Sequence, residues 1–154
     1  MSRRLHCLRW AVAGLGALSI GASAADDAAR AHMQYLHHCA GCHLADGSGE
    51  PAKGIPSMRG QLGLFLTVPG GREFIVQVPG VMNSPLSDRD TANLMNWLLP
   101  TITADTLPAN TAPYTAEEIA RLRATRPLDV MAVRATLVNQ LEAKAGEAGS
   151  AARR

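Results

Sequence analysis

Five residues, Cys39-Ala40-Gly41-Cys42-His43, constrain this 154-residue chain more than any other feature. Two cysteines three positions apart lie about one helical turn apart, so both thiols can reach the same edge of a flat ligand. C-x-x-C-H is the attachment sequence of a c-type haem, whose two vinyl groups form thioethers with the thiols. The histidine that follows is placed under the ring centre, where its imidazole can bind the iron. The motif predicts one covalently attached haem c, with His43 as an iron ligand.

Two other chemistries use a C-x-x-C pair, and neither fits this chain. A zinc ribbon needs a second pair of Cys or His ligands at suitable spacing, and the only other cysteine is Cys7. A thioredoxin-type dithiol needs a βαβ pattern around it, which the sequence lacks. The haem interpretation is therefore retained.

The first 24 residues are typical of a secretory signal peptide. Three arginines accompany an apolar run over residues 10–20, and Ala22-Ser23-Ala24 is a small-residue cleavage site, so we expect cleavage before Ala25. A membrane anchor is the alternative, but the run is well short of the ~20 residues that a spanning helix needs. Cys7 would leave with the signal. Export without a membrane anchor suits a c-type haem, which is attached outside the bacterial cytoplasm.

Cleavage also changes the charge of the chain. The full sequence has 15 Lys and Arg against 13 Asp and Glu, a net charge of +2. The signal holds three arginines and no acidic residue, so residues 25–154 keep 12 basic and 13 acidic residues and a net charge of −1. This balance does not favour nucleic acid as a partner. Aromatic content is only 4%, low for a self-sufficient core, and a buried haem would supply a large apolar body.

The sequence on both sides of the motif resembles the class I cytochromes c. In that family an aromatic residue one turn before the first cysteine packs on the last helix of the domain, and Tyr35 occupies this place. Ala31 stands where the family often has glycine and is still small. Further matches are a glycine-rich turn, a P-x-L-x-G segment and an L-S-D segment, here residues 46–49, 56–60 and 86–88. The resemblance implies an all-α cytochrome c fold of three to five helices around one haem, over residues 25–100.

The resemblance also implies two further contacts of the haem. The family's proline in the P-x-L-x-G segment accepts a hydrogen bond from Nδ1 of the proximal histidine, so Pro56 would orient His43. The second axial ligand of the family is a methionine in the loop before the last helix, where this chain has Met82. A thioether opposite histidine favours ferrous iron. The family has proline directly after this methionine, whereas here Asn83-Ser84-Pro85 follows.

Other candidates for the sixth position of the iron remain open, including a position with no protein ligand. Met58 takes the place of the family's leucine and is interpreted as core packing, as is Met95 within a helix. Met131 lies in the C-terminal extension. Three histidines before the motif are interpreted as a solvated helix face rather than as ligands: His32, His37 and His38.

The apolar pattern predicts the remaining elements of the haem domain. Residues 25–40 form a helix that runs into the motif. Residues 71–78 are expected to be helical, although two apolar runs around Pro69-Gly70-Gly71 also suit a hairpin. Ser87 is a ready N-cap, with Asp90 at the capping-box position, for a helix that Pro100 stops. The apolar stripe of that helix should meet Tyr35 and consists of Leu94, Trp97 and Leu98.

Residues 101–154 are predicted to be a linker and a helical C-terminal extension. The capping box that begins at Thr115 opens a short helix to about Ala124, and Asp129 leads a longer one. Residues 146–154 are interpreted as a frayed tail. The extension holds neither Cys nor His. We interpret it as a clamp laid over the haem domain, with a docking element for a partner protein as the alternative.

The sequence therefore predicts an electron-transfer protein rather than an enzyme. No cluster of general acids, bases or nucleophiles is evident. By resemblance, exported monohaem cytochromes accept electrons from a periplasmic dehydrogenase and pass them to an oxidase or another cytochrome, and some are bound subunits of the dehydrogenase. The alternatives are a peroxidase-like haem enzyme and a gas-binding haem sensor, which both need an open sixth position.

Export gives the first testable prediction. N-terminal sequencing of the protein from a periplasmic fraction should find Ala25 as the first residue, because signal peptidase cuts after the small residue Ala24. Recovery of the uncleaved chain from the membrane fraction would contradict it.

Overall fold

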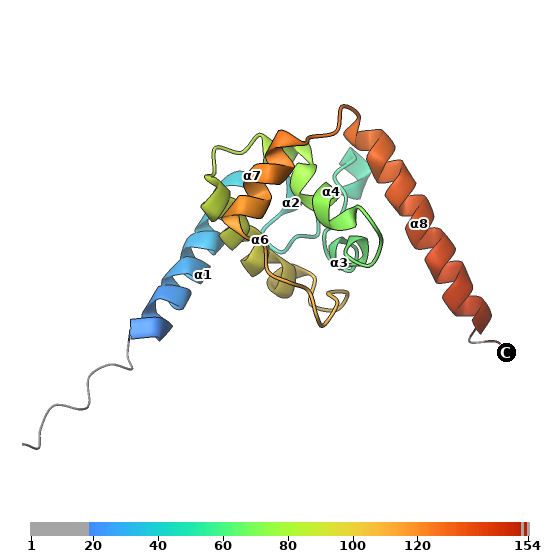
Figure 1. The fold of residues 1–154 in the computed structure, drawn as a ribbon, viewed down its shortest axis with the longest axis horizontal. Helices are drawn as coiled ribbons and strands as arrows, with labels where there is room; N and C mark the ends of the chain where they lie inside the picture. Colours follow the sequence, from blue (N-terminus) through green and yellow to red (C-terminus); the bar gives the residue numbers. More distant parts are fainter. Residues whose placement is uncertain (1–18, 152, 154) are drawn as a thin grey trace, which may run out of the picture.

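The computed structural model describes residues 19–151 and 153, and its elements are helices joined by loops (Figure 1). The only extended pairing in these residues is one isolated bridge between Glu50 and Ile55. The predicted all-α fold is confirmed. The helices in chain order are α1 (Ser19–His38), α2 (Ala40–His43), the 3₁₀ helix η1 (Pro51–Lys53), α3 (Leu62–Phe65), α4 (Gly71–Gln77), α5 (Pro79–Met82), α6 (Asp88–Ile102), α7 (Ala116–Ala124) and α8 (Val130–Ala151).

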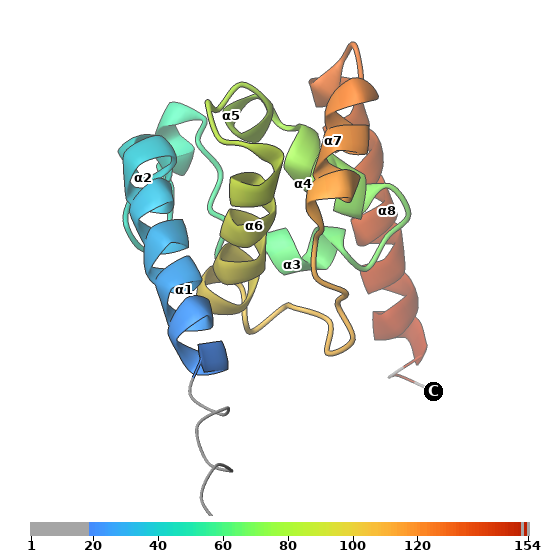
Figure 2. The ribbon, with the colours of Figure 1, turned by 60° about the vertical axis from the view of Figure 1, so that its left-hand side comes forward.

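The contact between α1 and α6 organises the part of the chain before the C-terminal extension, and Figure 2 shows the two helices side by side. Tyr35 is fully buried there, with Leu94 and Leu98 of α6, and Trp97 packs against the same cluster. Ala31, one turn earlier, is 1% exposed, which its small side chain permits. The predicted stripe on α6 is therefore confirmed. Because α1 runs directly into α2, this contact fixes where the C-x-x-C-H residues lie.

Of the two predicted ends of α6, the N-terminal one is confirmed and the C-terminal one is wrong. Ser87 caps the helix as predicted, accepting a hydrogen bond from the Asp90 backbone N–H at 3.1 Å. The prediction that Pro100 stops the helix is wrong, since α6 continues to Ile102. Proline removes its own N–H from the helix, and its ring crowds the carbonyl four residues earlier. Near the last turn that loss is small, and the Thr101 hydroxyl donates to the Trp97 carbonyl at 2.6 Å.

The C-terminal extension packs back onto the domain, as the clamp interpretation requires. α7 contacts α6 and α4, and α8 contacts α4 and α3 (Figure 2). Thr115 caps α7 through the Glu118 N–H at 3.2 Å, and Asp129 accepts from the Ala132 N–H at 2.9 Å at the start of α8. The prediction of a frayed tail from residue 146 is wrong for residues 146–151, which continue α8. Alanines, the best helix formers, alternate there with the two glycines.

The main core lies where α4, α6, α7 and α8 meet. Its members include Val76 and Ile119, both 0% exposed, and Leu137 of α8 at 2%. α4 has the helical form predicted for this segment rather than a hairpin. Arg72 of α4 forms a two-pronged ion pair with Glu118 at 2.7 and 2.8 Å, which lowers the pKa of the Glu118 carboxyl. Its guanidinium also lies 3.9 Å from the centre of the Tyr114 ring.

Residues 1–18, which carry most of the predicted signal peptide, lie outside the described residues. The predicted cleavage site falls inside α1, and cleavage before Ala25 would leave the helix from that residue to His38. Among the described residues, no helix is both long enough and apolar enough to cross a membrane.

Gly71 provides a test of the packing between α3 and α4. A Cβ added at Gly71 would overlap the Phe65 carbonyl, so Gly71→Ala must displace backbone. We expect it to lower the free energy of unfolding by about 1–3 kcal/mol, as overpacked cores do. Gly146→Ala on α8 is the matched control, because a Cβ there meets open space. The control should leave stability unchanged or raise it by up to about 1 kcal/mol, measured by chemical denaturation. Equal effects of the two variants would contradict this packing.

Candidate functional site

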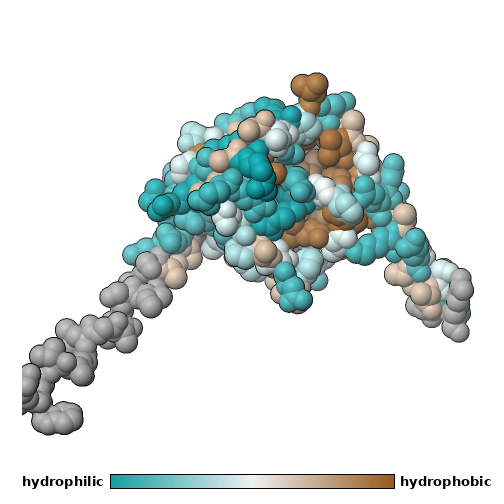
Figure 3. Space-filling model, viewed as in Figure 1, coloured by the Kyte–Doolittle hydropathy of each residue, from teal (hydrophilic) through white to brown (hydrophobic). Residues whose placement is uncertain are grey.

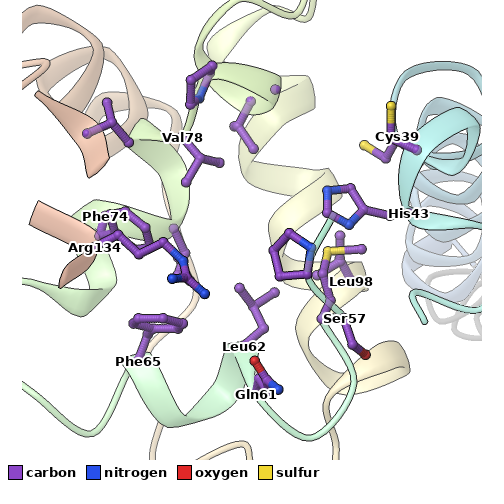
Figure 4. Close-up of a pocket in the computed structure, with 18 of the residues that line it drawn as sticks. Cys39, His43, Ser57, Gln61, Leu62, Phe65, Phe74, Val78, Leu98 and Arg134 are labelled. Atoms are coloured by element: carbon purple, nitrogen blue, oxygen red, sulfur yellow. The ribbon is translucent and has the colours of Figure 1, made fainter. Parts of the chain in front are cut away.

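A cavity of about 740 Å³ opens between the body of the molecule and α8. Figure 3 shows hydrophobic side chains gathered in this hollow, and Figure 4 shows the side chains that point into it. Every described helix except α7 contributes to its lining, α1 only through its last residue. The lining residues include Cys39, Cys42, His43, Pro56, Met58, Leu62, Phe65, Phe74, Ile75, Val78, Val81, Leu94, Met95, Leu98, Val130, Met131 and Arg134. An apolar cavity of this kind suits a large, mostly hydrophobic ligand.

The C-x-x-C-H residues form one turn of helix on the cavity wall. The His43 N–H donates to the Cys39 carbonyl at 2.9 Å, which closes the turn that carries both thiols. Cys39 and Cys42 are free thiols, the first half-buried and the second exposed. Burial raises the pKa of the Cys39 thiol. The structure therefore places the two predicted attachment residues and His43 together at one end of the cavity.

The backbone directly after His43 is held in an uncommon conformation. Leu44 has a φ of 61°, and its carbonyl accepts a hydrogen bond from the Tyr35 hydroxyl at 2.6 Å. Burial of the phenol raises the pKa of Tyr35 to about 12, so it stays protonated and remains a donor. Gly49, with a φ of 64°, donates to the His43 carbonyl at 3.0 Å. A Cβ at Gly49 would lie 2.6 Å from the Pro56 carbonyl oxygen, so glycine is needed where these segments meet.

The His43 ring points into the cavity (Figure 4). Its Nδ1 is buried and has no hydrogen-bond partner in this structure. Pro56 lines the cavity as well, but the predicted hydrogen bond from Nδ1 to its carbonyl is not formed here, and that role stays a prediction. A buried polar atom without a partner is costly, which indicates a ring held for a ligand rather than for packing.

Met82, the predicted second axial ligand, is half-buried at the end of α5. The three residues before it, Pro79, Gly80 and Val81, line the cavity, whereas Met82 itself is not among the lining residues. The structure thus brings the Met82 segment to the cavity rim without placing the thioether inside.

The structure also places the other candidate methionines and the three histidines before the motif. Met58 packs with Tyr35 and Leu98, which agrees with its interpretation as core. Met95 is 2% exposed in the main core, and Met131 is 69% exposed at the cavity mouth. All three histidines before the motif are exposed, as a solvated face predicts. His32 stacks on Trp97, and His38 reaches the cavity edge.

Arg134 of α8 is a site residue that the sequence did not reveal. It is the only Asp, Glu, Lys or Arg among the lining residues, and it lies across the cavity from Cys39 and His43 (Figure 4). Its neighbours Val130 and Met131 also line the cavity. The apolar stripe of α8 predicted packing, but no local signal distinguished packing against the domain from contact with a ligand.

These surroundings fit a haem. The apolar walls match the porphyrin faces, the two thiols match its vinyl groups, and the unpartnered imidazole matches the iron. Arg134 provides a positive charge on the far side, where the ring edge opposite the vinyl groups carries carboxylates.

Two comparisons place the chain among known proteins, one with family models and one with individual proteins. No family model matches the chain. A protein named cytochrome c-552 from one strain of Thermus thermophilus is 31% identical over 143 residues, covering 80% of this chain and 91% of the relative. A second protein named cytochrome c-552, also from Thermus thermophilus, is 31% identical over 119 residues, covering 64% of this chain and 90% of the relative.

The attachment site yields a direct prediction. In the double variant Cys39→Ser, Cys42→Ser, no thioether can form, so haem staining of the denatured protein on a gel should disappear. Gly41→Ala, within the same motif, is the matched control, because a Cβ there meets open space. The control should stain like the wild type. Staining of the double variant would show that attachment occurs elsewhere.

Proposed function

Because the chain belongs to the c-type cytochrome family, we propose that it is a periplasmic carrier that accepts single electrons from a dehydrogenase and passes them towards the respiratory chain. Its cofactor is a covalently bound haem c, and the chain has a single C-x-x-C-H motif for it. Family membership indicates electron transfer rather than catalysis. The haem supplies an iron that alternates between ferric and ferrous states.

The observation that carries the proposal is the position of the C-x-x-C-H turn on the wall of an apolar cavity. Apolar walls exclude water from a redox centre, so little solvent has to reorient when its charge changes. Cys42 is exposed, and the ring edge attached there would lie close to the surface, within reach of a partner protein. Among residues 19–151, no Asp or Glu lines the cavity, so this part of the wall supplies no carboxylate for the acid–base chemistry of a peroxidase-like enzyme.

We propose that His43 and Met82 would be the two protein ligands of the haem iron. The support for Met82 is its place at the end of α5, directly after three cavity-lining residues. Met58 is the less suitable donor, because it packs beside Tyr35 and Leu98 on the side of the cavity formed by α1 and α6. Met131 is largely exposed at the end of the cavity formed by α8.

The proposal is for a separate carrier rather than a bound subunit of the dehydrogenase. The extension, the part of the chain that a docking role would use, packs its inner sides on the core and the cavity, which supports its interpretation as a clamp. Export follows from the sequence of residues 1–24. A periplasmic dehydrogenase as donor, and an oxidase or another cytochrome as acceptor, are the partners that the resemblance to exported monohaem cytochromes implies.

The axial assignment predicts opposite results for two methionine variants. Met82→Ala removes a soft donor that favours ferrous iron, so the reduction potential should fall. The weak near-infrared ferric band of thioether ligation should vanish, and the ferrous protein should bind carbon monoxide readily. Haem attachment should persist, because Cys39 and Cys42 are unchanged. Absorption spectra and a redox titration measure all of these.

Met58→Leu is the matched control, since it removes a thioether from the cavity wall and keeps the volume nearly constant. It should keep the band and the potential of the wild type. Loss of the band in Met58→Leu with retention in Met82→Ala would reverse the assignment. Ready binding of carbon monoxide by the wild type would instead favour a haem enzyme or a gas sensor.

A further inference from the structure

The segment that carries Met82, residues 79–86, is tied to the rest of the molecule by few hydrogen bonds. Most of its bonds are local, such as those from the Met82 N–H to Val78 and from the Asn83 N–H to Pro79, both at 3.0 Å. Within the part of the chain that the structure describes, two hydrogen bonds join it to another element. Arg123 Nη2 donates to the Leu86 carbonyl at 3.0 Å, and Arg126 Nη1 donates to Asn83 Oδ1 at 3.1 Å. Both donors belong to the C-terminal extension.

Arg123 also holds the beginning of α6. Its Nη1 lies 2.8 Å from Asp88 Oδ1, and its Nη2 donates to Thr91 Oγ1 at 2.9 Å. The side chain is 23% exposed, so these charge-assisted bonds are partly shielded from water. One guanidinium thereby joins the end of the Met82 segment to the first turn of α6.

The end of α4, two residues before the segment, is bonded to the end of α7. Gln77, the last residue of α4, is 7% exposed, and its Nε2 donates to the carbonyls of Leu122 and Thr125 at 3.0 and 3.1 Å. The last carbonyls of a helix have few partners within it, and Gln77 adds a side-chain donor to the Leu122 carbonyl, which also accepts from the Thr125 N–H at 3.2 Å. Residues 122–126 therefore bond to Gln77, two residues before the Met82 segment, and to Asn83 and Leu86 within it.

We propose that Arg123, assisted by Arg126, is a positioning residue for the axial ligand Met82. The proposal rests on the assignment of Met82 in the proposed function. Gly80 leaves the segment free to adopt many backbone conformations, and Pro85 lies three residues after Met82 rather than next to it. A neutral thioether stays on an iron only while the chain holds it there, and groups around a ligand commonly set its orientation. Here that restraint comes from the extension.

The test uses the haem-loaded protein with Arg123→Met, which keeps the length of the side chain and removes its hydrogen bonds. The Met82 segment should then open more often, so carbon monoxide should bind the ferrous form at least about tenfold faster, given the strength of hydrogen bonds to charged groups. On heating, the near-infrared ferric band should be lost at a lower temperature than the far-UV circular dichroism. Arg121→Met is the matched control, an exposed arginine of α7 whose side chain makes no hydrogen bond within the described structure, and it should behave like the wild type.

Asn83→Ala gives a second test that leaves α7 and its packing intact. It removes the exposed acceptor of Arg126 and should speed carbon monoxide binding in the same direction by a smaller factor. If Arg123→Met does not fold, Asn83→Ala and Arg126→Gln decide the question, and wild-type rates in both would overturn the proposal.

Two results separate the proposal from the function on which it rests. In the first, Arg123→Met loses the near-infrared band and the circular dichroism at the same temperature and binds carbon monoxide at the rate of Arg121→Met. Such a protein has only lost stability, and the positioning role is overturned. A wild-type protein without the near-infrared band would overturn the axial role of Met82 itself, and the proposal with it.

Discussion

The burial of Tyr35 between α1 and α6 is the contact on which the site depends. Its ring is fully buried with Leu94 and Leu98, while its hydroxyl donates to the carbonyl of Leu44, directly after His43. One side chain thus joins the helix packing to the end of the C-x-x-C-H turn. Removal of the ring would leave a void in the packing, and removal of the hydroxyl alone would leave the Leu44 carbonyl with the Gly47 N–H as its remaining donor. The position of the cofactor-binding turn therefore follows from the packing of two helices rather than from the motif alone.

The opposite side of the cavity is built by the C-terminal extension. α7 meets α4 and α6 in the main core, and Arg72 fastens α4 to Glu118 and to the backbone carbonyls of Ala112 and Pro113. α8 then adds Val130, Met131 and Arg134 to the cavity wall. The low aromatic content of the chain fits this arrangement, since a haem and the extension together supply apolar surface that a small haem domain lacks.

Local signals carried most of what the sequence could predict. The C-x-x-C-H turn and the caps at Ser87 and Thr115 depend on residues within one turn of each other, and the structure has them as predicted. Features that depend on distant partners were missed. Arg134 lies on a helix whose neighbours only the fold determines, and Arg123 finds its acceptors 32 to 37 positions away. The errors at Pro100 and at residues 146–151 concern helix ends, where one unfavourable residue is outweighed by its neighbours. The roles of Pro56 and Met82 stay predictions, because they depend on how the chain closes around its ligand.

The position of Arg134 and its neighbours also bears on how the protein is assembled. These cavity-lining residues follow the two attachment cysteines by most of the length of the chain, so they leave the ribosome long after the thiols do. Until they arrive, one side of the cavity lacks its wall, and Cys39 and Cys42 remain open to the machinery that joins haem to them. Docking of α8 afterwards would close over the product. The order in which the segments emerge thus matches the order in which maturation needs them, with cofactor loading first and enclosure last.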